Sequence, residues 1–161
     1  FLSGPLHLGR IVSPRDGDTL VRPVLSPIVL GLALAAVFVV GGLVVREVPW
    51  LHDQVRSVTD FADQGALPLL VLVTVVNGVA EELFFRGAAY AAVPRHPVAW
   101  TSVAYVLATL ATGNVMLAFA AIVLGVVVGL ERRASGGILA PILTHCTWSL
   151  AMLVVLPLLF G

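Results

Sequence analysis

The sequence contains no lysine and only 11% charged residues, and these shortages exclude an ordinary soluble domain. A soluble domain carries about a quarter charged residues, because water must solvate its surface. Here hydrophobic residues make up 59% of the 161 residues, and the mean hydropathy is +1.04. A chain of this composition cannot cover a water-facing surface. We therefore expect an integral membrane protein that has membrane lipid as a partner on its outer surface.

Cysteine and basic runs are also scarce. The single cysteine, Cys146, has no second cysteine with which to form a disulfide. Nine arginines balance nine acidic residues, so the net charge is zero and no basic run indicates a nucleic-acid partner. Residues 1–23 lack a long apolar core and do not read as a signal peptide. Because the sequence opens at Phe1 rather than Met, we expect that upstream residues are missing.

Apolar segments make up most of the chain. A spanning helix needs about 20 mostly apolar residues, and five segments reach or approach this length. The sequence therefore predicts an all-α fold, a polytopic transmembrane bundle of about five helices. We divide the chain into an N-terminal segment, 1–23, and a transmembrane helical domain, 24–161. The expected spans are residues 24–45, 67–93, 98–112, 115–130 and 138–160.

Arginine placement predicts the orientation in the membrane. One set of arginines precedes the first expected span or lies in the turns after the second and fourth spans. On the opposite side, Arg46 and Arg56 are diluted by acidic residues. The positive-inside rule then places the N-terminus in the cytoplasm, and we expect a bacterial plasma membrane. The first set consists of Arg10, Arg15, Arg22, Arg95, Arg132 and Arg133.

Three ionisable side chains lie inside the second expected span: Glu81, Glu82 and Arg86. Each costs at least about 2.5 kcal/mol at the centre of a membrane helix and therefore indicates function by default. Glu82 and Arg86 are four residues apart, so they can pair on one helix face. Glu81 is rotated away from that pair and can point into an interior cavity, with Asn77 one turn earlier on its face.

A structural role competes with this functional interpretation. An ion pair alone could lock one helix into the bundle, but structure does not require the second glutamate. His145, with Ser149 one turn further on, is the other candidate, although a histidine hydrogen-bonded across a helix interface would explain it alone. Counting about 1.5 Å per residue along each helix brings Glu81, Thr109 and His145 to one layer of the membrane. Three helices then contribute polar groups to one site.

The run Glu-Glu-Leu-Phe-Phe-Arg-Gly at 81–87 resembles the Glu-Glu-x-x-x-Arg motif of the CAAX-protease and bacteriocin-processing (CPBP, or Abi) family. His145 with Ser149 resembles the third family motif, a histidine followed four positions later by Asn, Asp or a similar residue. Tyr105 and Thr109 stand where the second motif has Phe-x-x-x-His, so threonine replaces that histidine. The protease-like core covers about residues 67–155.

The resemblance implies an intramembrane endopeptidase that cleaves membrane-anchored proteins or peptides, in some relatives prenylated ones. It implies that Glu81 activates a water molecule. In such a mechanism we expect Arg86 to hold Glu82, and His145, alone or with Ser149, to donate hydrogen bonds to the developing oxyanion. Asn77, Tyr105, Thr109 and Ser149 are possible auxiliary residues. The alternative is a catalytically impaired member that acts as a membrane scaffold or binding partner, which the missing histidine favours.

A metal is not predicted, although relatives are often labelled metalloproteases. A catalytic zinc normally has three protein ligands. Glu81, Glu82 and His145 could supply three, but Glu82 is expected to be occupied by Arg86. We therefore expect a glutamate-dependent protease without a cofactor and leave zinc as the other possibility.

Overall fold

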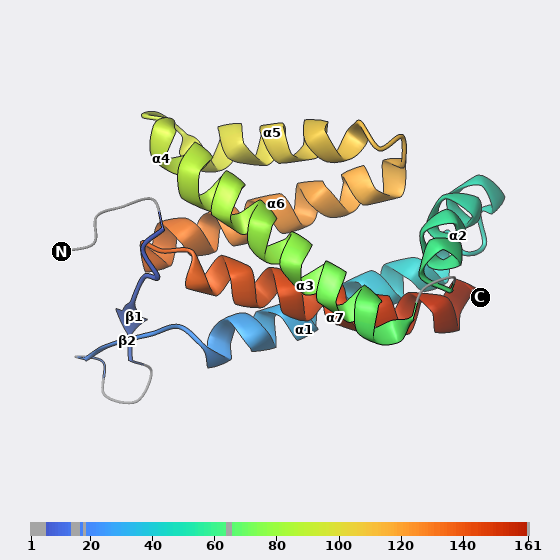
Figure 1. Cartoon of the computed structure of the whole chain (residues 1–161), viewed down its shortest axis with the longest axis horizontal. Coiled ribbons are helices and arrows are strands. Elements are labelled where there is room, and N and C mark those ends of the chain that lie inside the picture. The colour runs from blue at the N-terminus through green and yellow to red at the C-terminus, as the bar shows by residue number, and fades with distance from the viewer. Residues whose placement is uncertain (1–5, 14–16, 18, 64–65, 161) are drawn as a thin grey trace.

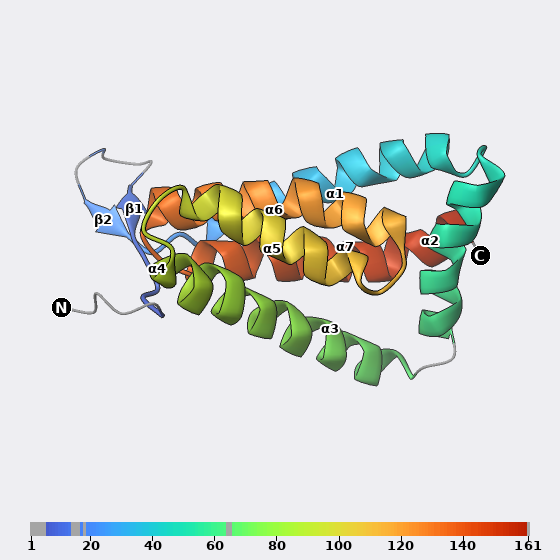
Figure 2. The same cartoon turned by 90° about the horizontal axis from the view of Figure 1, so that it is seen from above.

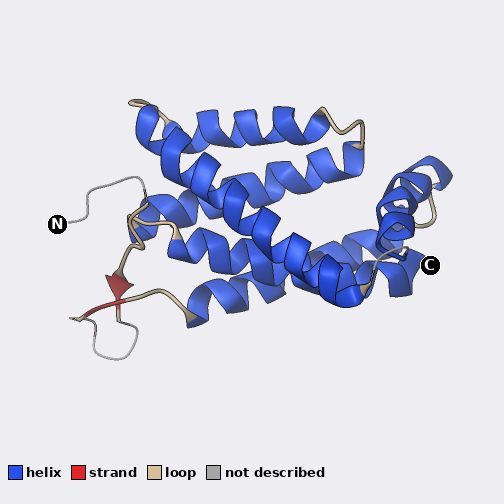
Figure 3. Cartoon of the chain, in the orientation of Figure 1, coloured by secondary structure: helices blue, strands red, loops and turns tan. Residues whose placement is uncertain are grey.

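The computed structural model describes residues 6–13, 17, 19–63 and 66–160 of the chain (Figure 1). Parts of the expected N-terminal segment, including Arg15, lie outside the described residues. The described part is mainly helical, with loops and one pair of short strands, which confirms the predicted all-α fold class (Figure 3). The helices are α1 (Leu25–Val45), α2 (Pro49–Asp63), α3 (Leu67–Glu82), the π-helical segment η1 (Leu83–Ala89), α4 (Tyr90–Ala92), α5 (Pro97–Leu110), α6 (Val115–Ser135) and α7 (Leu139–Phe160).

Among the described residues, four helices are long and apolar enough to cross a membrane: Leu25–Val45, Leu67–Ala92, Val115–Ser135 and Leu139–Phe160. The segments α3, η1 and α4 join without a break to form the second of these. With 14 residues, α5 is about 21 Å long, which is shorter than the hydrocarbon core of about 30 Å. The expected count of about five spans is thus corrected to four candidate spans and one shorter apolar helix.

Successive long helices run in opposite directions through the bundle (Figure 1). The start of α1, the α4–α5 turn and the α6–α7 turn lie at one end, so the arginines of these segments gather there. The α5–α6 turn, α2 and the C-terminus lie at the other end. Seen from above, α3 approaches the other helices at its C-terminal end and diverges from them toward its N-terminal end (Figure 2).

Small residues allow the helices to approach closely. A Cβ atom placed on Gly129 would lie 3.0 Å from Val98, and one on Gly125 would lie 3.3 Å from Tyr105. Ala121, one turn before Gly125, is also buried. The face of small residues at four-residue spacing on α6 therefore packs against α5, as such faces do between membrane helices.

The segment after α1 is the amphipathic helix α2, which lies across one end of the bundle (Figures 1 and 2). Asn114, at the start of α6, attaches α2 to the bundle. Its side-chain amide donates hydrogen bonds to the Gln54 carbonyl oxygen (2.6 Å) and to Ser57 Oγ (3.2 Å). Its Oδ1 accepts from the backbone N–H groups of Met116 and Leu117, which caps α6. Asn114 thus joins two helices.

The N-terminal segment caps α7. Its strands β1 (Ile11–Val12) and β2 (Leu20–Val21) pair antiparallel. Before β1, the chain crosses the α6–α7 turn, where the backbone N–H of Ile138 donates to the His7 carbonyl oxygen at 2.8 Å. Gly137 has no room for a side chain at this crossing, because a Cβ atom would overlap the backbone of Gly9. The N-terminal segment therefore satisfies a donor that the start of a helix leaves free.

Candidate active site

The predicted ion pair between Glu82 and Arg86 is present in the structure. Both side chains are fully buried, and Arg86 NH1 donates a hydrogen bond to Glu82 Oε1 at 3.1 Å. Arg86 NH2 donates to the carbonyl oxygen of Gly125 at 3.2 Å. The guanidinium carbon lies 4.7 Å from the ring centroid of Tyr105, within the range of a cation–π contact. The arginine thus ties η1 to α3, α5 and α6.

The helix changes to π-helical geometry directly after Glu82, over the seven residues of η1. Such turns are rare and occur frequently at functional sites. The carbonyl oxygen of Arg86, inside this segment, accepts a hydrogen bond from Arg132 Nε at 2.8 Å. The sequence assigns Arg132 only to the orientation in the membrane. Its buried contact with η1 gives it a structural role that no sequence signal predicted.

His145 contacts both glutamates. Its Nδ1 lies 2.7 Å from Glu82 Oε1, and its Nε2 lies 3.8 Å from Glu81 Oε2. Oε1 of Glu82 also accepts the hydrogen bond from Arg86 NH1, so we assign the proton of the contact to Nδ1 of His145. Glu82 therefore orients the imidazole ring and directs Nε2 toward Glu81. The sequence predicted Arg86 as the partner of Glu82, and the structure adds His145.

Glu81 has a different environment from its neighbour. Its side chain is 28% exposed and accepts a hydrogen bond from Asn77 Nδ2 at 2.9 Å on Oε1. The hydroxyl of Tyr105 also lies close enough to interact with this carboxylate. Glu81 thus faces an open space, whereas Glu82 lies behind it in the protein interior.

That space is a cavity of about 490 Å³ between α2, α3, α5, α6 and α7. Six of the eight side chains predicted from the sequence line it, and the buried Glu82 and Arg86 lie outside its lining. Thr109 reaches the cavity, but its hydroxyl donates to the Tyr105 carbonyl oxygen of its own helix at 2.9 Å. The six lining residues are Asn77, Glu81, Tyr105, Thr109, His145 and Ser149.

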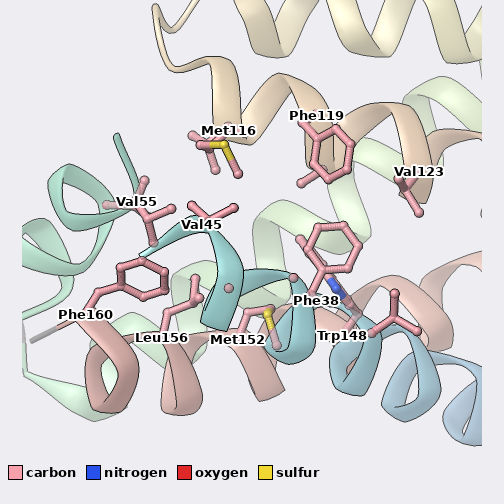
Figure 4. A pocket seen from close by; sticks show the side chains of 16 residues that line it. Phe38, Val45, Val55, Met116, Phe119, Val123, Trp148, Met152, Leu156 and Phe160 are labelled. Atoms are coloured by element: carbon pink, nitrogen blue, oxygen red, sulfur yellow. The ribbon is translucent and has the colours of Figure 1, made fainter. Parts of the chain in front are cut away.

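A second cavity, of about 220 Å³, lies beside the first and is almost entirely apolar (Figure 4). It is formed by α1, α2, α6 and α7, and the labelled side chains of Figure 4 surround it from all four helices. The sequence did not predict it. The two cavities share four wall residues: Val58, Leu117, Ala120 and Trp148.

The donor set does not fit a catalytic zinc. Among the residues that the structure describes, no group of three His, Cys, Asp or Glu side chains could hold a metal ion. Glu82 Oε1 and His145 Nδ1 are occupied by one another, which leaves Glu81 and His145 Nε2 as two ligands where zinc normally needs three. The absence of a cofactor stays a prediction.

Comparison with known proteins supports the resemblance noted in the sequence. A family model described as type II CAAX prenyl endopeptidase Rce1-like matches residues 63–151, which is more than half of the chain. Comparisons with curated proteins and with solved structures gave no match. The matched region contains every residue that lines the site on α3, α5 and α7.

Proposed function

The chain belongs to the Rce1-like family of type II CAAX prenyl endopeptidases, and we propose that it cleaves membrane-anchored proteins or peptides with a water molecule activated by Glu81. The observation that carries this proposal is the convergence of Glu81 Oε2 and His145 Nε2 on one cavity, 3.8 Å apart. This separation is too long for a direct hydrogen bond. It suits two groups that bind one water molecule between them.

In the proposed reaction, Glu81 takes a proton from this water, and the oxygen attacks the scissile carbonyl carbon. The new C–O bond forms as the carbonyl electrons move onto the carbonyl oxygen. When the C–N bond breaks, the leaving nitrogen receives the proton from Glu81. Arg86 holds the Glu82 carboxylate in place, and Glu82 in turn orients His145, as carboxylates commonly orient catalytic imidazoles.

The cavity also supports the proposed substrate class. It lies among helices that are long and apolar enough to cross a membrane. A peptide bond can reach Glu81 most directly when the substrate is itself anchored in or at the membrane. A non-catalytic scaffold would keep the Glu82–Arg86 pair but would not need the exposed carboxylate of Glu81. A substitution at Glu81 therefore distinguishes the protease from the scaffold.

The test is Glu81→Gln. The exchange keeps the size of the side chain and removes its basicity, so cleavage should fall by roughly 10²–10⁴-fold while the fold is retained. The assay is cleavage of prenylated and transmembrane peptides in reconstituted vesicles, with and without a chelator. Glu47→Gln is the matched control, because Glu47 is a highly exposed glutamate outside the cavity.

Wild-type cleavage that survives Glu81→Gln would contradict the mechanism. A wild type that cleaves no probe, but binds the same partner with or without Glu81, would favour the scaffold instead. Loss of activity with the chelator would show that a metal is required.

We also propose that the end of the bundle that carries Arg132 faces the cytoplasm. Single cysteines at the exposed positions Ala134 and Ala111, at opposite ends of the bundle, test this in a Cys146→Ala background. A membrane-impermeant maleimide added outside intact cells should label Ala111→Cys and spare Ala134→Cys. The reverse pattern would invert the orientation.

A further inference from the structure

The proposed reaction leaves negative charge on the carbonyl oxygen of the substrate, and this charge needs a hydrogen-bond donor in the same cavity. The sequence predicts His145 as that donor. The contacts of the cavity residues allow each candidate donor to be examined in turn. The inference that follows rests on the proposed function.

His145 has no free proton to offer. Its Nδ1–H is directed at Glu82 Oε1, 2.7 Å away. If the ring is neutral, Nε2 carries no proton and can only accept a hydrogen bond. If the ring is protonated, the Nε2–H faces the carboxylate of Glu81 at 3.8 Å. In both protonation states His145 serves the glutamates rather than the substrate oxygen.

Three other polar side chains of the cavity are also occupied. One of the two N–H groups of the Asn77 amide donates to Glu81 Oε1, which holds this amide against the general base rather than the substrate. The hydroxyl of Thr109 donates to the Tyr105 carbonyl oxygen, and the hydroxyl of Thr112 donates to the Thr109 carbonyl oxygen at 2.7 Å. These protons stabilise Glu81 or the end of α5.

The hydroxyls of Thr74, Tyr105 and Ser149 and the indole N–H of Trp148 are the candidates left in the cavity lining. The Trp148 Nε1 has no hydrogen-bond partner among the described residues, but it is fully buried and therefore does not face the cavity. Thr74 lies seven residues before Glu81 on the same helix, about 10 Å along its axis. Ser149 lies four residues beyond His145, about 6 Å along α7. Of these, only the hydroxyl of Tyr105 interacts with the Glu81 carboxylate, and the Tyr105 ring centroid lies 6.3 Å from that of His145. Tyr105 therefore lies beside both groups that bind the reacting water.

We propose that the hydroxyl of Tyr105 donates the hydrogen bond that stabilises the oxyanion. Before the reaction, this hydroxyl is directed at the ionised Glu81. When Glu81 takes the proton from water, its negative charge disappears and the same charge develops on the substrate oxygen. The Tyr105 hydroxyl then turns from one oxygen to the other and keeps its own proton.

The ring of Tyr105 is held firmly enough for this role. It is buried, with the Arg86 guanidinium 4.7 Å from its centroid and the Phe85 ring 5.1 Å away. On the α6 side, Gly125 leaves just enough space for the ring, since a Cβ atom there would lie 3.3 Å from Tyr105 Cδ1. A donor fixed in this way needs little rearrangement during the reaction, which is what oxyanion stabilisation requires.

Tyr105→Phe is the direct test, because it removes the hydroxyl and keeps the ring contacts. We expect kcat to fall by about 10²–10³-fold with little change in KM, since the hydrogen bond is made only in the transition state. A purely packing role would leave kcat unchanged. Tyr90→Phe is the matched control: its ring also contacts an arginine, with the Arg132 guanidinium at 5.1 Å, but it lies outside the cavity.

Glu81→Gln, Ser149→Ala and a phosphonamidate peptide distinguish a failure of the Tyr105 inference from a failure of the proposed function. If Glu81→Gln abolishes cleavage and Tyr105→Phe does not, the Tyr105 inference is wrong and the proposed function stands. If Ser149→Ala causes the loss expected for Tyr105→Phe, Ser149 is the donor and the inference is also wrong.

Binding of a phosphonamidate peptide, whose tetrahedral phosphorus imitates the intermediate, gives a readout that does not depend on turnover. Tyr105→Phe should weaken its binding at least about tenfold and leave the binding of the parent peptide unchanged. Equal affinity of wild type and Tyr105→Phe for the phosphonamidate would overturn the inference.

Discussion

The two cavities of the bundle share four wall residues but differ in their chemistry. The first contains Glu81, His145 and Tyr105 and is backed by a buried ion pair. The second is lined by aliphatic, aromatic and methionine side chains (Figure 4). Helix α7 contributes to both, with His145 on the polar side and Met152 on the apolar side. A few residues along one helix thus separate two different environments.

The difference shows where the fold depends on specific partners. In the first cavity every charged group needs a counterpart, because a buried charge without a partner is strongly unfavourable. In the second, side chains contact one another without directional bonds. We therefore expect substitutions behind the polar cavity to be far more damaging than substitutions that change the shape of the apolar one.

Arg86→Ala should have the largest effect on stability. It removes the partner of the fully buried Glu82 carboxylate, and breaking a buried pair in this way costs about 3–5 kcal/mol. The loss of the hydrogen bond to the Gly125 carbonyl oxygen adds to this cost. The expected result is a strong fall in folded yield, measured by size-exclusion chromatography in detergent.

Arg133→Ala is the control for this variant, because Arg133 is exposed near the end of the same bundle. It should express and elute like the wild type. Normal yield and thermal stability of Arg86→Ala would show that the Glu82–Arg86 contact does not support the fold.

Much of the polar cavity could be predicted from the sequence. The four-residue spacing of Glu82 and Arg86 predicts their contact, which the structure contains. Counting residues along the helices placed Glu81, Thr109 and His145 at one depth, and all three line one cavity. Both inferences succeed because they need only helical geometry and the rule that membrane helices run across the bilayer.

The remaining features depend on contacts between distant segments, which spacing within one helix cannot predict. The His145–Glu82 contact joins α7 to α3, and the Arg132–Arg86 contact joins α6 to η1. The Ile138–His7 hydrogen bond joins α7 to the N-terminal segment. The π-helical geometry of η1 has no known signal in these residues.

The amphipathic helix α2 is the feature that the sequence could have revealed. Because of Asp53, Arg56 and Asp60, the segment between the first two expected spans has the composition of a polar connection. Leu51, Val55 and Val58 recur at the spacing of one helix face, and the last two line the apolar cavity. Reading the apolar positions rather than the charges would have predicted a helix that covers this end of the bundle.

The smallest effect is expected from filling the apolar cavity at Gly41. Gly41 lines this cavity, and a Cβ atom built on it would meet nothing within 4 Å. Gly41→Leu should therefore fit, and by removing glycine from the interior of α1 it should stabilise the helix by up to about 1 kcal/mol. The measurement is the thermal unfolding midpoint in detergent, with cleavage followed in parallel.

Gly31→Leu provides the matched contrast on the same helix. A Cβ atom on Gly31 would lie 2.8 Å from both the carbonyl oxygen of Thr144 and Cβ of Thr147, so α1 and α7 would have to separate. Such overpacking costs about 1–3 kcal/mol. Because both variants introduce the same side chain into α1, a difference between them reports the space around each glycine rather than the hydrophobicity of leucine. If Gly41→Leu lowers the unfolding midpoint as much as Gly31→Leu does, the space beside Gly41 cannot accommodate a side chain, and the apolar cavity does not tolerate a change of shape at this position.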